Sequence, residues 1–152
     1  MGWGVIDENN STLTLIECGA IRTQAGLPHP ERLLTLYNEL GALIRQYQPT
    51  NAAIEELFFG KNVNTALTVG QARGVALLTL AQAGLPIAEY KPLAIKQAVA
   101  GYGGADKKQV QEMVRLTLSL PAIIKPDDAA DAVAIAICHA YTAPMLRRIG
   151  SV

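Results

Sequence analysis

The hydrophobic period of this chain changes several times along its length, and this alternation restricts the fold more than any other feature. Residues 4–7 and 13–22 are rich in aliphatic and β-branched side chains without a helical period, so they predict two strands. The turn-forming residues 8–11 lie between them and indicate a hairpin. From Glu31 the apolar residues recur at steps of three and four, which is typical of an amphipathic helix.

Helices alternate with short strands in the remainder of the chain. This order predicts an α/β fold in three layers, with a mixed sheet flanked by helices. The expected elements after the first helix are a strand over 51–55, a helix over 62–83, a strand over 87–90, a helix opened by Pro92, a helix from Asp106 or Lys107 to Leu120, and a helix from Asp127 or Asp128 to about Tyr141.

The composition indicates one folded domain. The chain has 152 residues, of which 50% are hydrophobic and 17% charged, so it is not a disordered protein. Its apolar runs are shorter than a membrane span, and no signal peptide is visible, which predicts a cytoplasmic protein with no membrane partner. The formal net charge is zero, so any nucleic-acid binding must come from a local basic face.

Three aspartates open the last predicted helix, which is apolar on nearly every other side. Asp128 and Asp131 are three residues apart and are therefore neighbours on one face. Burying two carboxylates together is costly unless a cation compensates their charge, so the pattern predicts a divalent metal site. Alternatively, Asp127 or Asp128 caps the helix, whose positive end favours a carboxylate. A cap does not explain Asp131, which lies inside the first turns.

Glu55 ends the short predicted strand over 51–55. Ligands of α/β sheets bind at the carboxyl ends of strands, so Glu55 is a second candidate. The only two phenylalanines, Phe58 and Phe59, follow in a loop, where an exposed aromatic ring can stack on bases or wedge between them. The alternative is a hydrophobic lid folded onto the core.

A glycine-rich stretch at 101–104 leads into a helix start that carries Lys107 and Lys108. Backbone N–H groups and lysines at such a position suit a phosphate, although lysines are commonly only solvated. Lysine is also disfavoured at the positive end of a helix, so its presence there favours a functional role for these two lysines.

A ridge of small residues runs along the helix predicted over 62–83. Ala66, Gly70 and Gly74 lie four apart and let another backbone come close, either inside the subunit or between subunits. The two histidines, His29 and His139, are isolated and are interpreted as structural.

Several short motifs follow one another along nearly the whole chain: GWGVI at 2–6, GAIRT at 19–23, AIE at 53–55 followed by Phe58, Lys61-Asn62, GQARGVA at 70–76, ADKKQVQ at 105–111 and DAADA at 128–132. In this order they resemble RuvC, the bacterial Holliday-junction resolvases of the ribonuclease-H-like nuclease superfamily.

The resemblance implies a homodimeric endonuclease that nicks two opposed strands of a four-way DNA junction in recombination and repair. It further implies a pair of Mg²⁺ ions per active site, with Mn²⁺ as a substitute, and a branch-migration motor complex as partner. The residues matched by position are Glu55, Asp128 and Asp131 as metal ligands, Lys107 as the catalytic-site lysine, Phe58 as the aromatic inserted at the junction, and Lys61, Asn62, Arg73 and Lys108 as further DNA contacts.

One motif of the family is not matched. Its first strand carries an Ile-Asp-Pro-Gly-like motif with a fourth carboxylate and would lie just before Gly2, whereas this sequence starts at Met1. We therefore expect a single RuvC-like domain over 1–152 that is incomplete at its N-terminus, with a central strand absent from the sheet. A chain of this kind would bind junctions but cleave them weakly or not at all, and the alternative function is a junction-binding protein impaired in catalysis.

Overall fold

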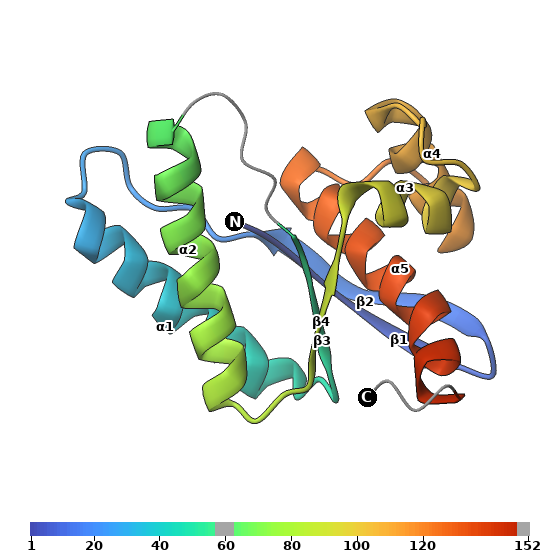
Figure 1. Ribbon diagram of the computed structural model, residues 1–152, viewed down its shortest axis with the longest axis horizontal. Helices are drawn as coiled ribbons and strands as arrows, with labels where there is room; N and C mark the ends of the chain where they lie inside the picture. The colour runs from blue at the N-terminus through green and yellow to red at the C-terminus, as the bar shows by residue number, and fades with distance from the viewer. Residues whose placement is uncertain (57–62, 149–152) are drawn as a thin grey trace. The chain divides into compact units, whose positions relative to one another are not determined.

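The computed structural model describes residues 1–56 and 63–148 and has an α/β fold (Figure 1). The chain divides into two compact units, which are described in turn: the first is Met1, Ile21–Ala52 and Glu56–Ile87, and the second is Gly2–Ala20, Ala53–Glu55 and Ala88–Val152. The elements are, in order, β1 (Gly2–Asn9), β2 (Thr12–Ala20), α1 (His29–Tyr47), β3 (Ala52–Glu55), α2 (Val63–Gln82), β4 (Ile87–Tyr90), α3 (Pro92–Ala100), α4 (Lys107–Thr117) and α5 (Asp127–Arg148).

The predicted hairpin is confirmed as the antiparallel pair β1–β2. Its turn consists of Asn10 and Ser11, whose φ angles of 50° and 67° are the positive values that a type I′ turn requires. Val5 pairs with Glu17 while Ile6 pairs with Leu15, so β2 carries one extra residue at this point. Such a bulge bends its strand and increases the local twist.

The strands form two separate sheets, β1–β2 and β3–β4. Within residues 1–56 and 63–148 no strand is hydrogen-bonded to both sheets, so the single mixed sheet of the sequence prediction is replaced by two strand pairs. The predicted fold class, helices packed around a small sheet in an α/β chain, is otherwise confirmed.

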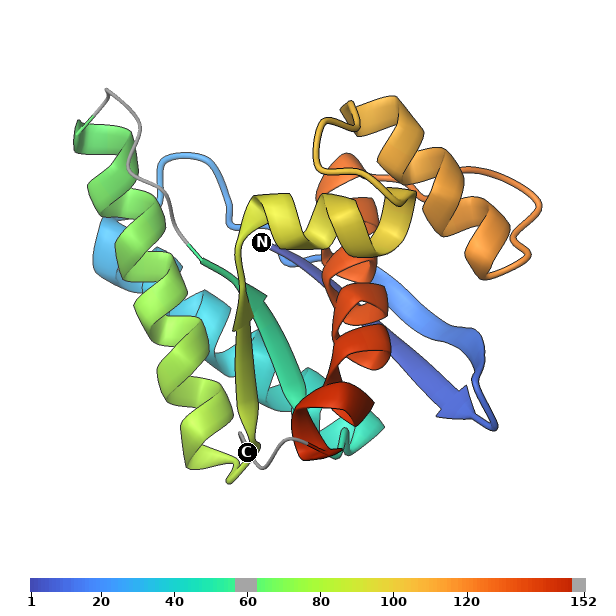
Figure 2. The same cartoon turned by 45° about the vertical axis from the view of Figure 1, so that its right-hand side comes forward.

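Helix α5 is the centre of the second unit (Figure 2). It contacts β1 and β2 as well as α3 and α4, which explains why its sequence is apolar on nearly every side. Ala129, Val133 and Ile137 repeat at steps of four along it and are completely buried. The first turns of α5 are therefore fixed by the core, and the residues that they expose have defined positions.

Helix α4 begins where a capping box places it. The Asp106 carboxylate accepts a hydrogen bond from the Gln109 backbone N–H at 2.9 Å, and the Gln109 side chain accepts one from the Asp106 backbone N–H at 2.9 Å. These bonds satisfy two donors that a helix start otherwise leaves unpaired. The helix therefore starts at Lys107, which is one of the two start positions predicted from the sequence.

The first unit is built on α1 and α2, which pack against each other. Leu36 of α1 is buried, as are Ala76 and Leu80 of α2. His29 forms a 2.7 Å hydrogen bond between its Nε2 and Gln71 Oε1, so it joins the two helices, in agreement with its structural interpretation. Among residues 1–56 and 63–148, none of the helices combines the length and the apolar character that a membrane span requires.

Candidate active site

The acidic residues of α5 lie at its start, in the second unit. Asp127 and Asp128 are in its first turn, and Asp131 follows one turn later with an exposed side chain. The helix start also lies close to β1, because a Cβ atom added at Gly2 would collide with the backbone carbonyl of Asp128. The absence of a side chain at Gly2 thus allows this approach of strand and helix.

Glu55 comes from a distant part of the sequence and is coupled electrostatically to one of these aspartates, Asp131. It ends β3 and belongs to the same unit. Desolvation raises the pKa of the Glu55 carboxyl, and the negative charge of Asp131 raises it further. Glu55 is therefore an electrostatic neighbour of Asp131, whose negative charge makes ionisation of Glu55 less favourable.

Lys107 supplies the positive charge at this site. Its Nζ donates a hydrogen bond to Asp131 Oδ2 at 3.1 Å and lies 3.4 Å from Asp127 Oδ2. The hydrogen bond to Asp131 is the main reason why the pKa of Lys107 is raised. This pairing explains a lysine at the positive end of α4, where the helix dipole alone disfavours it.

Lys125 and Asp127 form a further ion pair beside Lys107 and Asp131. The sequence did not predict this pair. Lys125 Nζ donates to Asp127 Oδ1 at 2.8 Å, so the two oxygens of Asp127 face two different lysines. The hydrogen bond from Lys125 is the main reason why the pKa of Asp127 is lowered. The sequence interpretation of Asp127 as a possible cap overlooked these partners. Helix α5 begins at Asp127, so this residue lies inside the helix.

The other predicted site residues have different positions. Asp128 and Lys108 are exposed at the starts of α5 and α4. Arg73 lies on α2, in the first unit. Phe58, Lys61 and Asn62 lie outside the described residues.

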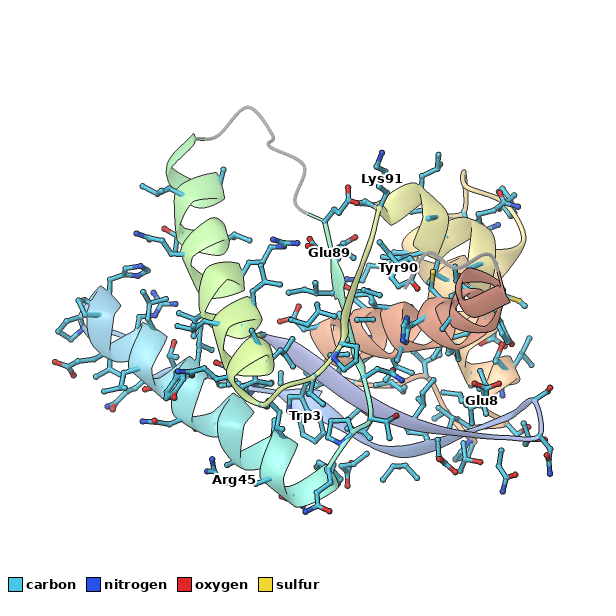
Figure 3. All side chains as sticks on the ribbon, turned by 60° about the horizontal axis from the view of Figure 1, so that its bottom comes forward. Trp3, Glu8, Arg45, Glu89, Tyr90 and Lys91 are labelled. Atoms are coloured by element: carbon cyan, nitrogen blue, oxygen red, sulfur yellow. The ribbon has the colours of Figure 1, made fainter. Side chains whose placement is uncertain are left out.

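His139 is a partly buried residue of α5 with a structural role. The Tyr90 hydroxyl and His139 Nδ1 are 2.9 Å apart and hydrogen-bonded, and the two rings meet edge to face. Tyr90 is buried at the end of β4, between Glu89 and Lys91 in the sequence (Figure 3). The bond satisfies a buried hydroxyl, as its burial requires, and agrees with the sequence interpretation of His139.

The donor chemistry of the site fits an oxygen-ligated divalent cation. Carboxylates are the ligands that Mg²⁺ prefers, and Glu55 and Asp131 are two that repel each other in the absence of a cation. The arrangement is incomplete as a metal centre, however. Across residues 1–56 and 63–148, no three His, Cys, Asp or Glu side chains converge closely enough to hold an ion.

Comparisons with known proteins agree in pointing to one family. A family model described as "Crossover junction endodeoxyribonuclease RuvC" matches residues 1–139. The protein of that name from Chloroflexus aurantiacus is 73% identical over 99% of this chain and 92% of its own length. Its counterpart from Roseiflexus sp. is 73% identical over 98% of this chain and 89% of its own length.

Solved structures give the same result. The structure of "T. thermophilus RuvC in complex with Holliday junction substrate" matches with a TM-score of 0.88 and 34% identity, covering 95% of this chain and 88% of that chain. Another, "Thermus thermophilus RuvC structure", matches with a TM-score of 0.87 at the same identity. The fold and the acidic site thus define a nuclease of the ribonuclease-H-like class. The chain belongs to the RuvC family of crossover junction endodeoxyribonucleases, and this membership implies a divalent-metal-dependent nuclease.

Proposed function

We propose that this chain resolves four-way DNA junctions by paired symmetric nicks, in recombination and DNA repair. The observation that carries the proposal is the proximity of Glu55 and Asp131, which come from separate parts of a RuvC-family sequence. The T. thermophilus relative was solved with a Holliday junction substrate, which supports the same class of DNA for this chain.

Each charged residue of the site has a part in this proposal. Glu55, Asp128 and Asp131 would hold a pair of Mg²⁺ ions, for which Mn²⁺ can substitute. When bound, such ions activate a water molecule and stabilise the leaving oxygen. Lys107, whose side chain is half exposed, directs its ammonium group to the edge of the acidic site and would face the scissile phosphate.

The remaining DNA contacts would come from residues around this site and from α2. Lys108 is exposed beside Lys107, and both would bind phosphates. Phe58 would insert at the junction, and Lys61, Asn62 and Arg73 would bind the neighbouring backbone. Because the net charge of the chain is zero, such a local set of contacts must supply the attraction for DNA.

Incubation of a labelled four-way junction with the wild-type chain, with and without Mg²⁺, tests the proposed function. We expect symmetric nicks in opposed strands that require Mg²⁺. A retarded band without nicks would instead support the alternative, a junction-binding protein impaired in cleavage. The names of the relatives describe nucleases, so they do not favour that alternative. No retardation and no nicks would contradict both functions.

The proposed protein is a cytoplasmic bacterial homodimer, built from one RuvC-like domain per chain and working with a branch-migration motor complex. Support for the dimer comes from α2. One face of this helix is buried through Ala76 and Leu80, whereas Leu67 and Leu78 are exposed. Gly74 lies between these leucines, and a Cβ added there would meet no atom within 4 Å. A second copy of the chain could therefore approach this face closely.

A Leu78→Glu substitution is expected to convert the dimer into a monomer, because it places a charge on an apolar face that the dimer would bury. Leu34→Glu on α1 is the matched control, since Leu34 and Leu78 are 57% and 55% exposed and belong to the same unit. Sedimentation equilibrium gives the oligomeric state of each variant. A dimer that survives Leu78→Glu, or dissociates equally with Leu34→Glu, would contradict this interface.

A further inference from the structure

Asp127 contacts two lysines, and neither a place at the helix start nor metal binding requires these contacts. Its side chain is about half exposed, and its two oxygens contact two different lysines, Lys107 at the start of α4 and Lys125 just before α5. Oδ1 accepts a hydrogen bond from Lys125 at 2.8 Å, while Oδ2 lies 3.4 Å from Lys107 Nζ. Lys107 also binds Asp131, so one ammonium group is shared between two carboxylates.

The shared ammonium group poses a problem for the proposed chemistry. The oxygen that Lys107 contacts, Asp131 Oδ2, belongs to a carboxylate that is proposed to hold a cation, and a cation bound there would compete with the ammonium group for its negative charge. A lysine held by Asp131 alone would lose its partner at that moment, and its long side chain would be free to leave the site. Fixing a flexible lysine at one position costs side-chain entropy, which a second anchor offsets.

We propose that Asp127 is a positioning residue for Lys107: it retains the Lys107 ammonium group at the edge of the acidic site when Asp131 is engaged elsewhere, and Lys125 orients Asp127 for this role. The inference rests on the proposed function, because it concerns the lysine assigned to the scissile phosphate. Its basis is the chain of contacts Lys125–Asp127–Lys107–Asp131.

Alternatively, Asp127 acts only through the helix. An acidic residue in the first turn stabilises a helix through its dipole, whether or not a lysine is near. The two roles differ in what happens when Lys107 is removed. A dipole effect of Asp127 persists in that background, whereas a positioning effect disappears with the residue that is positioned.

A double-mutant cycle on junction cleavage separates the two roles. We expect Asp127→Asn to lower the single-turnover rate constant about threefold to tenfold without changing junction affinity, and Asp127→Glu to restore part of the loss. In a chain that already carries Lys107→Gln, Asp127→Asn should change the rate constant less than about twofold. Glu112→Gln on α4 is the matched control, since it removes a carboxylate that binds Arg115 and should leave cleavage unchanged.

A second measurement requires no cleavage at all. The hydrogen-exchange rate of the Lys107 ammonium group, followed by ¹H–¹⁵N NMR and assigned with Lys107→Gln, reports how firmly this group is held. We expect Asp127→Asn to accelerate this exchange about threefold in the metal-free protein, and Lys125→Gln to accelerate it less. Glu112→Gln should leave it unchanged.

The possible outcomes separate the inference from the function on which it rests. If Lys107→Gln cleaves at the wild-type rate, the role of Lys107 in the proposed function is wrong, and the inference is wrong with it. If Lys107→Gln is impaired but Asp127→Asn is not, only the positioning role fails. Unchanged ammonium exchange in Asp127→Asn would overturn the inference even in a chain that does not cleave junctions.

Discussion

An Asp131→Asn variant is expected to cleave four-way junctions about 100-fold more slowly than the wild-type chain, or to lose cleavage completely, and to bind them as tightly as before. Asparagine has nearly the same shape as aspartate, so the substitution removes little except the charge. That charge is what raises the pKa of Glu55 after desolvation and what holds Lys107. One substitution therefore disturbs both the paired carboxylates and the lysine beside them.

Binding should survive because it depends on different residues. Affinity for DNA comes mainly from contacts of cationic groups with phosphates, and Asp131 contributes none of them. Folding should survive as well. Asp131 is exposed, its ion pair with Lys107 lies at the surface, and surface ion pairs contribute little to stability.

The measurement is a single-turnover cleavage assay with Mg²⁺, combined with a gel-shift titration and a thermal unfolding curve. Asp7→Asn is the matched control, because Asp7 is an exposed aspartate of β1 that undergoes the same chemical change. It should cleave like the wild-type chain. If Asp131→Asn retains cleavage within about threefold, Asp131 does not hold a catalytic metal, and the proposed ligand set is wrong.

The parts of this site that could be predicted from sequence are those that depend on local pattern. Two aspartates three residues apart on an apolar helix must share a face, whatever surrounds the helix. A glutamate that ends a short apolar strand lies at the carboxyl end of that strand, where α/β sheets bind ligands. The positions of Asp131 and Glu55 therefore agree with the sequence predictions, and their roles as metal ligands remain proposals.

The pairing of charges could not be predicted in the same way. Lys107 and Asp127 are far apart in sequence, and only the packing of α4 and α5 brings them together. The available signal was indirect: a lysine at the positive end of a helix indicates a compensating carboxylate, but not which one. The separation into two strand pairs also depends on long-range contacts, which hydrophobic period alone does not contain.

Gly4→Ala is expected to destabilise the protein by about 1–3 kcal/mol, although it adds only one methyl group. The added Cβ would lie 2.5 Å from Val133 Cγ2 and 3.3 Å from the Val133 backbone N. Val133 is completely buried and belongs to a helix, where a β-branched side chain has one strongly preferred rotamer. The valine cannot turn away, so β1 and α5 must separate.

A second substitution shows whether this contact is the cause. Val133→Ala alone should cost about 1–3 kcal/mol through lost burial and the cavity left behind. In the double variant the methyl group added at Gly4 would occupy part of that cavity, so the combined loss should be smaller than the sum by about 1 kcal/mol or more. Urea unfolding of the four proteins gives this coupling energy.

Gly104→Ala is the matched control, because its added Cβ would make only ordinary contact with Tyr102 at 3.6 Å. It should leave stability unchanged or raise it by about 0.4–1 kcal/mol, as glycine replacement does at unstrained positions. Strictly additive losses for Gly4→Ala and Val133→Ala would show that the collision is not the cause. The same displacement of α5 would shift Asp128 and Asp131, which α5 carries, relative to β1, so Gly4→Ala should also slow cleavage, and Val133→Ala in the same chain should restore part of it.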